Sequence, residues 1–235
     1  MSARGVAIGV LTTCVVLVAG AFVADRVAES QAEKRVVEAV EQNLDGVVGT
    51  PSVELGGFPF LTQLLAGSVD VVTGEVEGVT LEGIDATDVT LDARDVSTSE
   101  PYTVGTASIS ATLPTASIEQ IVADRSQLDV TVAVDGDALT ASGRVLGLAL
   151  AANLVPRVED GRLLVNVENV LIGGLTVSVD DLPGAIGDRL TDVEIPVEGL
   201  PEGLVLSDVT VVADGVRITA DGTDVVLPTT TAPAG

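Results

Sequence analysis

Residues Val76–Val96, VEGVTLEGIDATDVTLDARDV, contain the pattern that decides the fold class. Towards the end of this stretch, Leu91 and Ala93 alternate with the polar residues Thr90 and Asp92. Successive side chains of an extended strand point to opposite faces, so a period of two residues predicts a strand with one buried face. The stretch therefore predicts β-structure in which one side of a sheet packs on a core.

The same alternation recurs along most of the chain. It is found at residues 107–113, 128–134, 139–145, 175–179, 209–213 and 216–220. Asp-Gly pairs at Asp135-Gly136, Asp160-Gly161 and Asp214-Gly215 are typical of tight turns between neighbouring strands. The chain thus predicts an antiparallel sheet built from hairpins, interrupted by two short helices at residues 114–126 and 182–190.

An uncharged apolar segment, Val6–Ala24, precedes the β-rich region. Its 19 residues rise about 1.5 Å each in a helix, which is enough to cross a hydrocarbon core about 30 Å thick. Arg4 favours a cytoplasmic N-terminus and export of the remainder. Ala19-Gly20-Ala21 also resembles a cleavage site. We therefore expect either a single-pass cell-membrane protein with an extracytoplasmic C-terminal domain or an exported protein that has lost a signal segment.

Residues 25–44, DRVAESQAEKRVVEAVEQNL, are rich in helix formers and carry apolar residues such as Val27, Ala28 and Val36 near helical spacing. They predict an amphipathic helix whose apolar stripe docks on the domain or lies on a membrane surface. The expected organisation is a membrane anchor or signal segment at residues 1–24, an extracytoplasmic lipid-binding-like domain at residues 25–227, and a disordered tail at residues 228–235.

The composition excludes several classes of function. The chain carries 35 acidic and 11 basic side chains, a formal net charge of −24, so we expect no nucleic-acid partner. Histidine is absent and the sole cysteine, Cys14, lies in the apolar segment, which removes histidine-based triads, thiol nucleophiles and Cys/His metal sites. Acidic pairs such as Asp180-Asp181 and Asp221/Asp224 lack the calcium-loop pattern. We expect no catalytic residue, no metal site and no cofactor.

Large apolar side chains gather in one short region after the predicted helix. The block Gly56–Leu61, GGFPFL, holds two of the three aromatic residues outside the apolar segment, and two leucines follow at Leu64 and Leu65. Glycines and a proline predict an ordered turn, and the apolar residues could present a face to lipid. They could also form a core plug between helix and sheet, because large side chains are scarce in this chain.

A second apolar stretch, Val145–Val155 (VLGLALAANLV), lacks the alternation of the other strands. It predicts either a strand buried on both faces or the wall of a cavity, whose small Ala and Gly residues would leave room for acyl chains. Arg144 and Arg157 flank the stretch and could contact a phosphate group.

The order of these features resembles the LmeA-like phospholipid-binding family of actinobacterial envelope proteins. The resemblance rests on the apolar segment leading into Asp25-Arg26-Val27-Ala28, on the helix that follows, and on Gly57–Gly67, GFPFLTQLLAG. It implies an extracytoplasmic domain that binds phospholipid and supports lipoglycan or envelope assembly. It also fits a tubular lipid-binding fold of the β-rich α+β class, with a twisted antiparallel sheet wrapped on a long N-terminal helix.

The residue patterns and the resemblance together predict non-enzymatic phospholipid binding in the cell envelope, extending to lipid carriage. The expected partners are phospholipid and, through residues 6–24, the membrane, while no protein partner is indicated. The alternative is a structural or interaction protein of the envelope with a filled core and no lipid. The residues predicted to bind lipid are Phe58, Phe60, Leu61, Leu64, Leu65, Leu146, Leu148 and Leu150.

Overall fold

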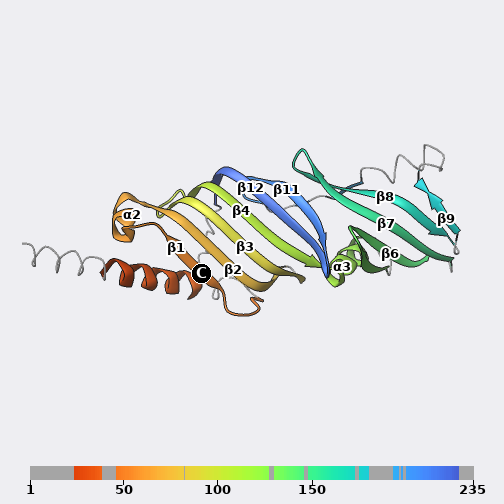
Figure 1. Ribbon diagram of the computed structural model, residues 1–235, viewed down its shortest axis with the longest axis horizontal. Helices are drawn as coiled ribbons and strands as arrows, with labels where there is room; N and C mark the ends of the chain where they lie inside the picture. The colour runs from red at the N-terminus through yellow and green to blue at the C-terminus, as the bar shows by residue number, and fades with distance from the viewer. Residues whose placement is uncertain are drawn as a thin grey trace, which may run out of the picture.

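The computed structural model describes residues 24–38, 46–81, 83–126, 130–145, 148–172, 175–179, 193–195, 197 and 200–227. These residues form an elongated, strand-rich molecule (Figure 1). The predictions made for residues 1–23, 39–45, 182–190 and 228–235 lie outside them. Within the described ranges, no helix is both long enough and apolar enough to cross a membrane.

The elements follow one another in a simple order. A helix at residues 24–38 comes first. It is followed by β1 (Ser52–Gly56), α2 (Phe60–Ala66), β2 (Ser68–Leu81), β3 (Ile84–Ser97), β4 (Thr103–Pro114), α3 (Thr115–Ser126), β5 (Val130–Asp135), β6 (Ala138–Val145), β7 (Leu148–Glu159), β8 (Arg162–Ile172), β9 (Leu175–Ser178), β10 (Val193–Ile195), β11 (Glu202–Val212) and β12 (Gly215–Val226).

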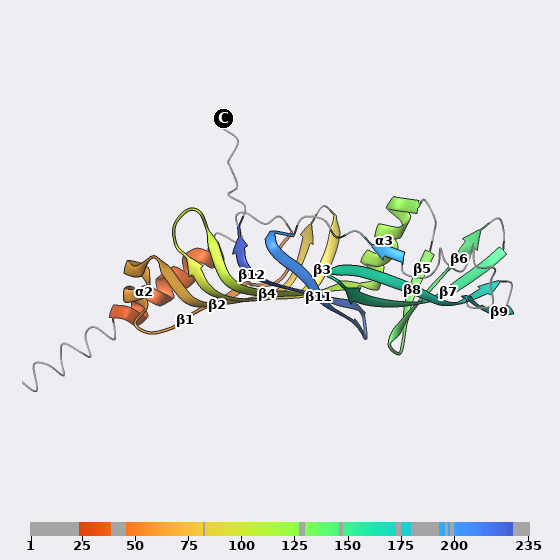
Figure 2. The same ribbon diagram turned by 90° about the horizontal axis from the view of Figure 1, so that it is seen from above.

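The strands divide into two antiparallel sheets. The first has the order β1-β2-β3-β4-β12-β11, and the second has the order β10-β8-β7-β6-β5 with β9 paired to β8. Figures 1 and 2 show the two sheets following one another along the length of the molecule. The predicted β-rich α+β class with an N-terminal helix is confirmed, but two sheets stand where one was expected.

The apolar side of the first sheet forms a core. Leu91 and Ala93 of β3 lie opposite Ile109 and Ala107 of β4, so the alternating residues face the same side as predicted. This alignment across strands is what buries them. The buried members of the cluster are Ala93, Val104, Ala107, Leu204 and Val225.

Apolar clusters also join the two sheets. Ile118 of α3 packs in one cluster with Val132 of β5 and Val216 of β12. Leu163 of β8 packs in another with Leu206 of β11. Because these contacts connect β11 and β12 to strands of the second sheet, the two sheets share apolar packing at their junction.

The N-terminal helix docks on the first sheet through two alanines. Ala28 and Ala32 pack against a buried cluster formed by Leu55, Phe60 and Val69. Alanine has a small side chain, so the helix can approach the strands closely. The helix lies beside β1 and α2 at one end of the molecule (Figures 1 and 2).

The face that docks coincides only in part with the apolar stripe expected from the sequence. Val27 and Val36 are exposed rather than packed on the sheet. The two alanines contact the sheet instead, and the acidic residues Asp25 and Glu29 are buried on the docked helix. The docked face therefore overlaps the predicted apolar stripe at Ala28, and polar contacts fix this helix in addition to apolar packing.

Candidate functional site

The first candidate site is α2 with the turn that precedes it. Gly57 has a φ of 100°, and a side chain there would collide with Gln63 and Asp70, so the turn requires glycine. Helix α2 ends at Gly67, whose left-handed conformation lets its N–H bond the carbonyl oxygens of Gln63 and Leu64. The GGFPF block and Gly67 therefore delimit the short helix that the sequence suggested.

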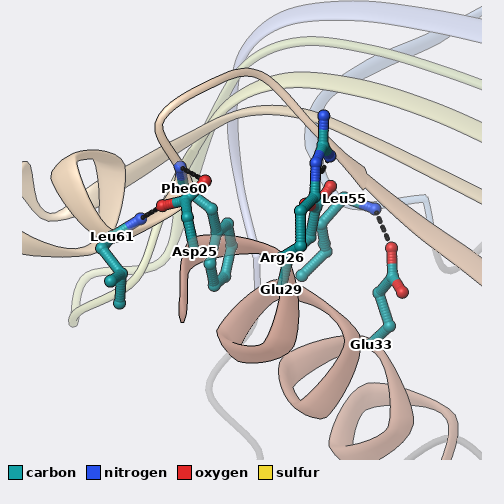
Figure 3. A network of polar contacts seen from close by, with 7 residues as sticks. All are labelled: Asp25, Arg26, Glu29, Glu33, Leu55, Phe60 and Leu61. Carbon is teal, nitrogen blue, oxygen red and sulfur yellow. Dashed lines mark hydrogen bonds and ion pairs between the residues drawn. The ribbon is translucent and has the colours of Figure 1, made fainter. Parts of the chain in front are cut away.

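The start of α2 is held by a residue from a distant part of the chain. Pro59 provides no side-chain cap. Instead the Asp25 carboxylate accepts hydrogen bonds from the N–H groups of Phe60, at 2.9 Å, and Leu61, at 2.7 Å (Figure 3). A carboxylate satisfies N–H groups that have no partner in the first turn and also interacts favourably with the helix dipole. Asp25 is only 3% exposed, so this cap lies inside the protein.

Further polar contacts fasten the N-terminal helix at this end. The Glu33 carboxylate accepts a hydrogen bond from the N–H of Leu55 in β1 at 3.1 Å. Arg26 and Glu29 form an ion pair at 2.6 Å, which Figure 3 shows beside the Asp25 cap. The Arg26 guanidinium also lies 5.9 Å from the centre of the Phe58 ring, within the range of a cation–π interaction. The helix, β1 and α2 are thus tied together as one unit.

The predicted lipid-binding residues of this region divide into two groups. Phe60 is 1% exposed and belongs to the core, as the core-plug alternative proposed. The others are exposed at the surface: Phe58 (57%), Leu61 (41%), Leu64 (41%) and Leu65 (91%). Positions three and four apart share one face of a helix. Leu61, Leu64 and Leu65 therefore form an exposed apolar face, and lipid contact by these residues stays a prediction.

The second candidate site is a hollow of about 730 Å³ on the second sheet. The pairing of neighbouring strands places four residues in a row across β5, β6, β7 and β8: Thr131, Ser142, Ala151 and Leu171. These four belong to the lining, which consists of Val130, Thr131, Ser142, Gly143, Arg144, Ala149, Leu150, Ala151 and Leu171. Gly143, Ala149 and Ala151 have small or no side chains, which leaves space between the larger neighbours.

The hollow combines two kinds of chemistry. Leu171 supplies apolar surface, while Arg144 supplies a cation and Ser142 a hydroxyl group. The Ser142 hydroxyl donates to the Thr131 carbonyl oxygen at 3.4 Å. Binding sites for small molecules commonly measure about 300–1,000 Å³ and mix apolar walls with a few polar groups. The arrangement suits an amphiphile with a negatively charged end.

The structure places the other predicted residues as follows. Leu150 is half-buried in β7 and borders the hollow, but alternation along the strand turns its side chain to the face opposite Ala149 and Ala151. Leu148 begins β7, where its side chain is not described, and Leu146 lies outside the described residues. Arg157 pairs with Glu159 at 3.4 Å and is not part of the hollow. Figure 1 places α2 and the second sheet at opposite ends of the molecule, so the two predicted groups do not form one site.

The acidic pairs do not form a metal site in the described part of the chain. No group of three or more potential metal ligands gathers there. Asp221 and Asp224 lie within β12 rather than in a turn. Hydrogen bonds from Ser108 and Ser207 hold the pKa of the exposed Asp221 carboxyl below its ordinary value of 3.8. The Asp180-Asp181 pair lies outside the described residues.

Several residues of both candidate sites were not singled out by the sequence. Asp25 directly follows an apolar segment and precedes α2 by 35 residues, so nothing local marks it as a cap. Ser142 and Leu171 sit on alternating strands, but only the pairing of β6, β7 and β8 brings them together. Alternation could have identified the face to which each belongs, although not its neighbours.

Comparison with known proteins gives one match. The sequence model of a family described as LmeA-like phospholipid-binding matches residues 23–221. No curated protein and no solved structure matches the chain significantly. The matched range covers the N-terminal helix, α2 and the strands that line the hollow. This match extends over most of the sequence, and the chain belongs to the LmeA-like phospholipid-binding family.

Proposed function

We propose that the protein binds a phospholipid in the hollow of the second sheet, without catalysing a reaction. The observation that carries this proposal is the joint presence of Arg144, Ser142 and Leu171 in one hollow of about 730 Å³. The family is a phospholipid-binding family and not an enzyme family, which makes phospholipid the supported ligand class.

The apolar part of the ligand would contact Leu171 and Ala151. Each methylene group removed from water contributes about 0.8 kcal/mol, so even partial cover of an acyl chain supplies useful affinity. Gly143 and Ala151 have no side chain or a small one, so they leave the space over the face of the sheet open. Larger side chains at these positions would occupy the volume that the ligand needs.

The phosphate group would be bound at Arg144. A guanidinium group can donate two parallel hydrogen bonds to phosphate oxygens. The chain has a net charge of −24, so its general field repels an anion. A local cation is therefore needed, and Arg144 is the charged side chain in the lining of the hollow.

The cellular setting belongs to the same proposal. Residues 6–24 would anchor the protein in the cell membrane or export it, leaving the lipid-binding domain outside the cytoplasm. Lipid carriage and support of lipoglycan or envelope assembly follow from the family resemblance. The tubular arrangement, with the sheet wrapped on the N-terminal helix, is supported by the packing of Ala28 and Ala32 on the first sheet.

The test is lipid analysis of the protein expressed without residues 1–23. Native mass spectrometry and solvent extraction would measure bound phospholipid in the wild type, in Arg144→Ala, in Ala151→Phe and in Arg162→Ala. Arg162 is a matched control, because it is an exposed arginine of the same sheet that pairs with Glu194 and lies outside the hollow. Phospholipid should be retained by the wild type and Arg162→Ala and reduced in the other two variants.

The alternative, an envelope interaction protein without lipid, predicts a different result. A folded, lipid-free wild type would favour it. Equal phospholipid content in all four proteins would reject the hollow as the binding site while leaving lipid binding in place. Circular dichroism on each variant separates loss of lipid from loss of fold.

A further inference from the structure

We propose that the exposed face of α2 docks on the surface of the lipid bilayer, next to the point where the apolar segment leaves it. This face, the α2 tip, is formed by Phe58, Leu61, Leu64 and Leu65. The inference rests on the proposed membrane anchor at residues 6–24. It assigns a different role from lipid binding in the hollow, since it concerns the contact between the protein and the membrane as a whole.

The α2 tip has the chemistry of a membrane-contacting surface. Its four side chains are exposed, and Leu65 has 91% of its surface in contact with solvent. No charged residue occurs between Glu54 and Asp70, although the chain as a whole carries a net charge of −24. An exposed apolar patch within so acidic a protein marks a contact site, because apolar surface left in water is unfavourable. The four side chains of the tip are uncharged, which favours its approach to lipid head groups.

The position of the α2 tip identifies the lipid bilayer as the surface that it contacts. Asp25 directly follows the apolar segment, which ends at Ala24. Its carboxylate binds the backbone N–H groups of Phe60 and Leu61 at 2.9 and 2.7 Å. The residue that follows the segment is therefore hydrogen-bonded to the start of α2. If residues 6–24 span the bilayer, the tip must lie at its surface.

Neighbouring contacts fit an interfacial position. The Arg26 guanidinium lies 5.9 Å from the centre of the Phe58 ring. Arginine can reach towards lipid phosphates while an adjacent aromatic ring enters the interface. A few leucines inserted at this depth bind a membrane weakly on their own. The anchor holds them next to the bilayer at high effective concentration, so weak contacts are sufficient.

Docking would fix the orientation of the molecule. An anchor alone permits the domain to swivel about residue 24, whereas a second contact at the α2 tip restricts that motion. The second sheet, whose strands line the hollow, lies at the end of the molecule opposite α2 (Figures 1 and 2). The docked orientation thus holds the lipid-binding end in a defined position relative to the membrane.

The test uses the full chain reconstituted in dioleoylphosphatidylcholine vesicles, with an environment-sensitive fluorophore attached to single cysteines. Native Cys14 reports on the anchor, and Leu65→Cys in a Cys14→Ser background reports on the tip. Leu175→Cys in the same background is the matched control, because Leu175 is a 74% exposed leucine in β9 of the other sheet. Each label is measured with and without nitroxide groups on the lipid acyl chains.

The expected result is strong quenching by nitroxide lipid at positions 14 and 65, a blue-shifted emission at position 65, and little change at position 175. Quenching at 14 without quenching at 65 would overturn tip docking but leave the anchor and lipid binding intact. A blue shift at 65 without quenching would mean that protein covers the tip, which also overturns the inference. No quenching at position 14 would remove the anchor on which the inference rests, whereas lipid content of the hollow is measured separately.

Discussion

The two sheets use the same sequence pattern for different purposes. In the first sheet, apolar residues such as Val104, Leu204 and Val225 are buried in a filled core. In the second, Arg144 on the polar face of β6 and half-buried Leu171 of β8 line an open hollow. Alternation of apolar and polar residues therefore reports which side of a strand is apolar, but it does not report whether the opposite side is open to a ligand.

The difference arises from side-chain size and from the elements that cover each sheet. The N-terminal helix packs on β1 and β2 of the first sheet, and Phe60 of α2 fills the space beside it. Around the hollow, Gly143, Ala149 and Ala151 leave volume that larger residues would fill. The first sheet should consequently govern stability and the second should govern ligand binding.

The largest effect on stability is expected from Phe60→Ala. Its ring is 1% exposed and packs with Leu55 and Val69. Removing a buried phenylalanine side chain leaves a cavity and typically costs about 3–5 kcal/mol. Urea unfolding of the chain lacking residues 1–23, followed by circular dichroism, would measure the loss. The control Phe58→Ala removes an exposed ring and should change stability far less; equal losses would contradict the division of this motif into core and surface residues.

A pair of leucines compares the two sheets directly. Leu204→Ala in the buried cluster of the first sheet should cost about 2–5 kcal/mol. Leu171→Ala in the hollow should cost only about 1 kcal/mol in lipid-free protein, because its side chain is half-buried and already contacts solvent. Lipid retention should show the opposite order, with the greater loss in Leu171→Ala. Similar stability losses in the two variants would mean that the hollow is as tightly packed as the core of the first sheet.

Sequence reasoning identified the fold class because period-two alternation is a local property. Leu91 and Ala93 do lie on the core side of β3, as their spacing predicts. The number of sheets depends on contacts between distant strands, including the pairing of β12 with β4. No local pattern specifies that pairing, which explains why one sheet was expected and two are present.

The candidate sites were predictable to a similar extent. The block around Phe58 and Phe60 was recognised, but its composition could not separate the exposed ring from the buried one. The apolar stretch of β7 was recognised too, and Leu150 borders the hollow. Ser142 and Leu171 join it through register, which requires knowledge of the pairing. Their contribution becomes visible only in three dimensions.

A smaller effect is expected from Asp25→Ala, which removes the cap of α2 without altering the core cluster. Losing a side-chain cap usually costs about 0.5–2 kcal/mol, and the N–H groups of Phe60 and Leu61 would be left without this acceptor. Limited proteolysis should detect faster cleavage near α2, while urea unfolding measures the global loss. Glu33→Ala removes a contact from the same helix to β1 and serves as the comparison. Unchanged cleavage near α2 in Asp25→Ala would contradict a role for this cap in ordering the tip.

The smallest effect concerns the polar side of the first sheet, where Asp221 receives hydrogen bonds from Ser108 and Ser207. These bonds lower the pKa of the folded-state carboxyl below 3.8, so they stabilise the fold above that pH. The stabilisation is lost as pH falls through the lowered pKa, because the unfolded chain then binds the proton more readily. Asp221→Asn should cost less than about 0.5 kcal/mol at neutral pH, since solvent screens an exposed charge. The difference from wild type in urea unfolding should shrink on acidification, and Ser108→Ala should reduce the same pH dependence; a difference that grows on acidification would reverse the assigned sign.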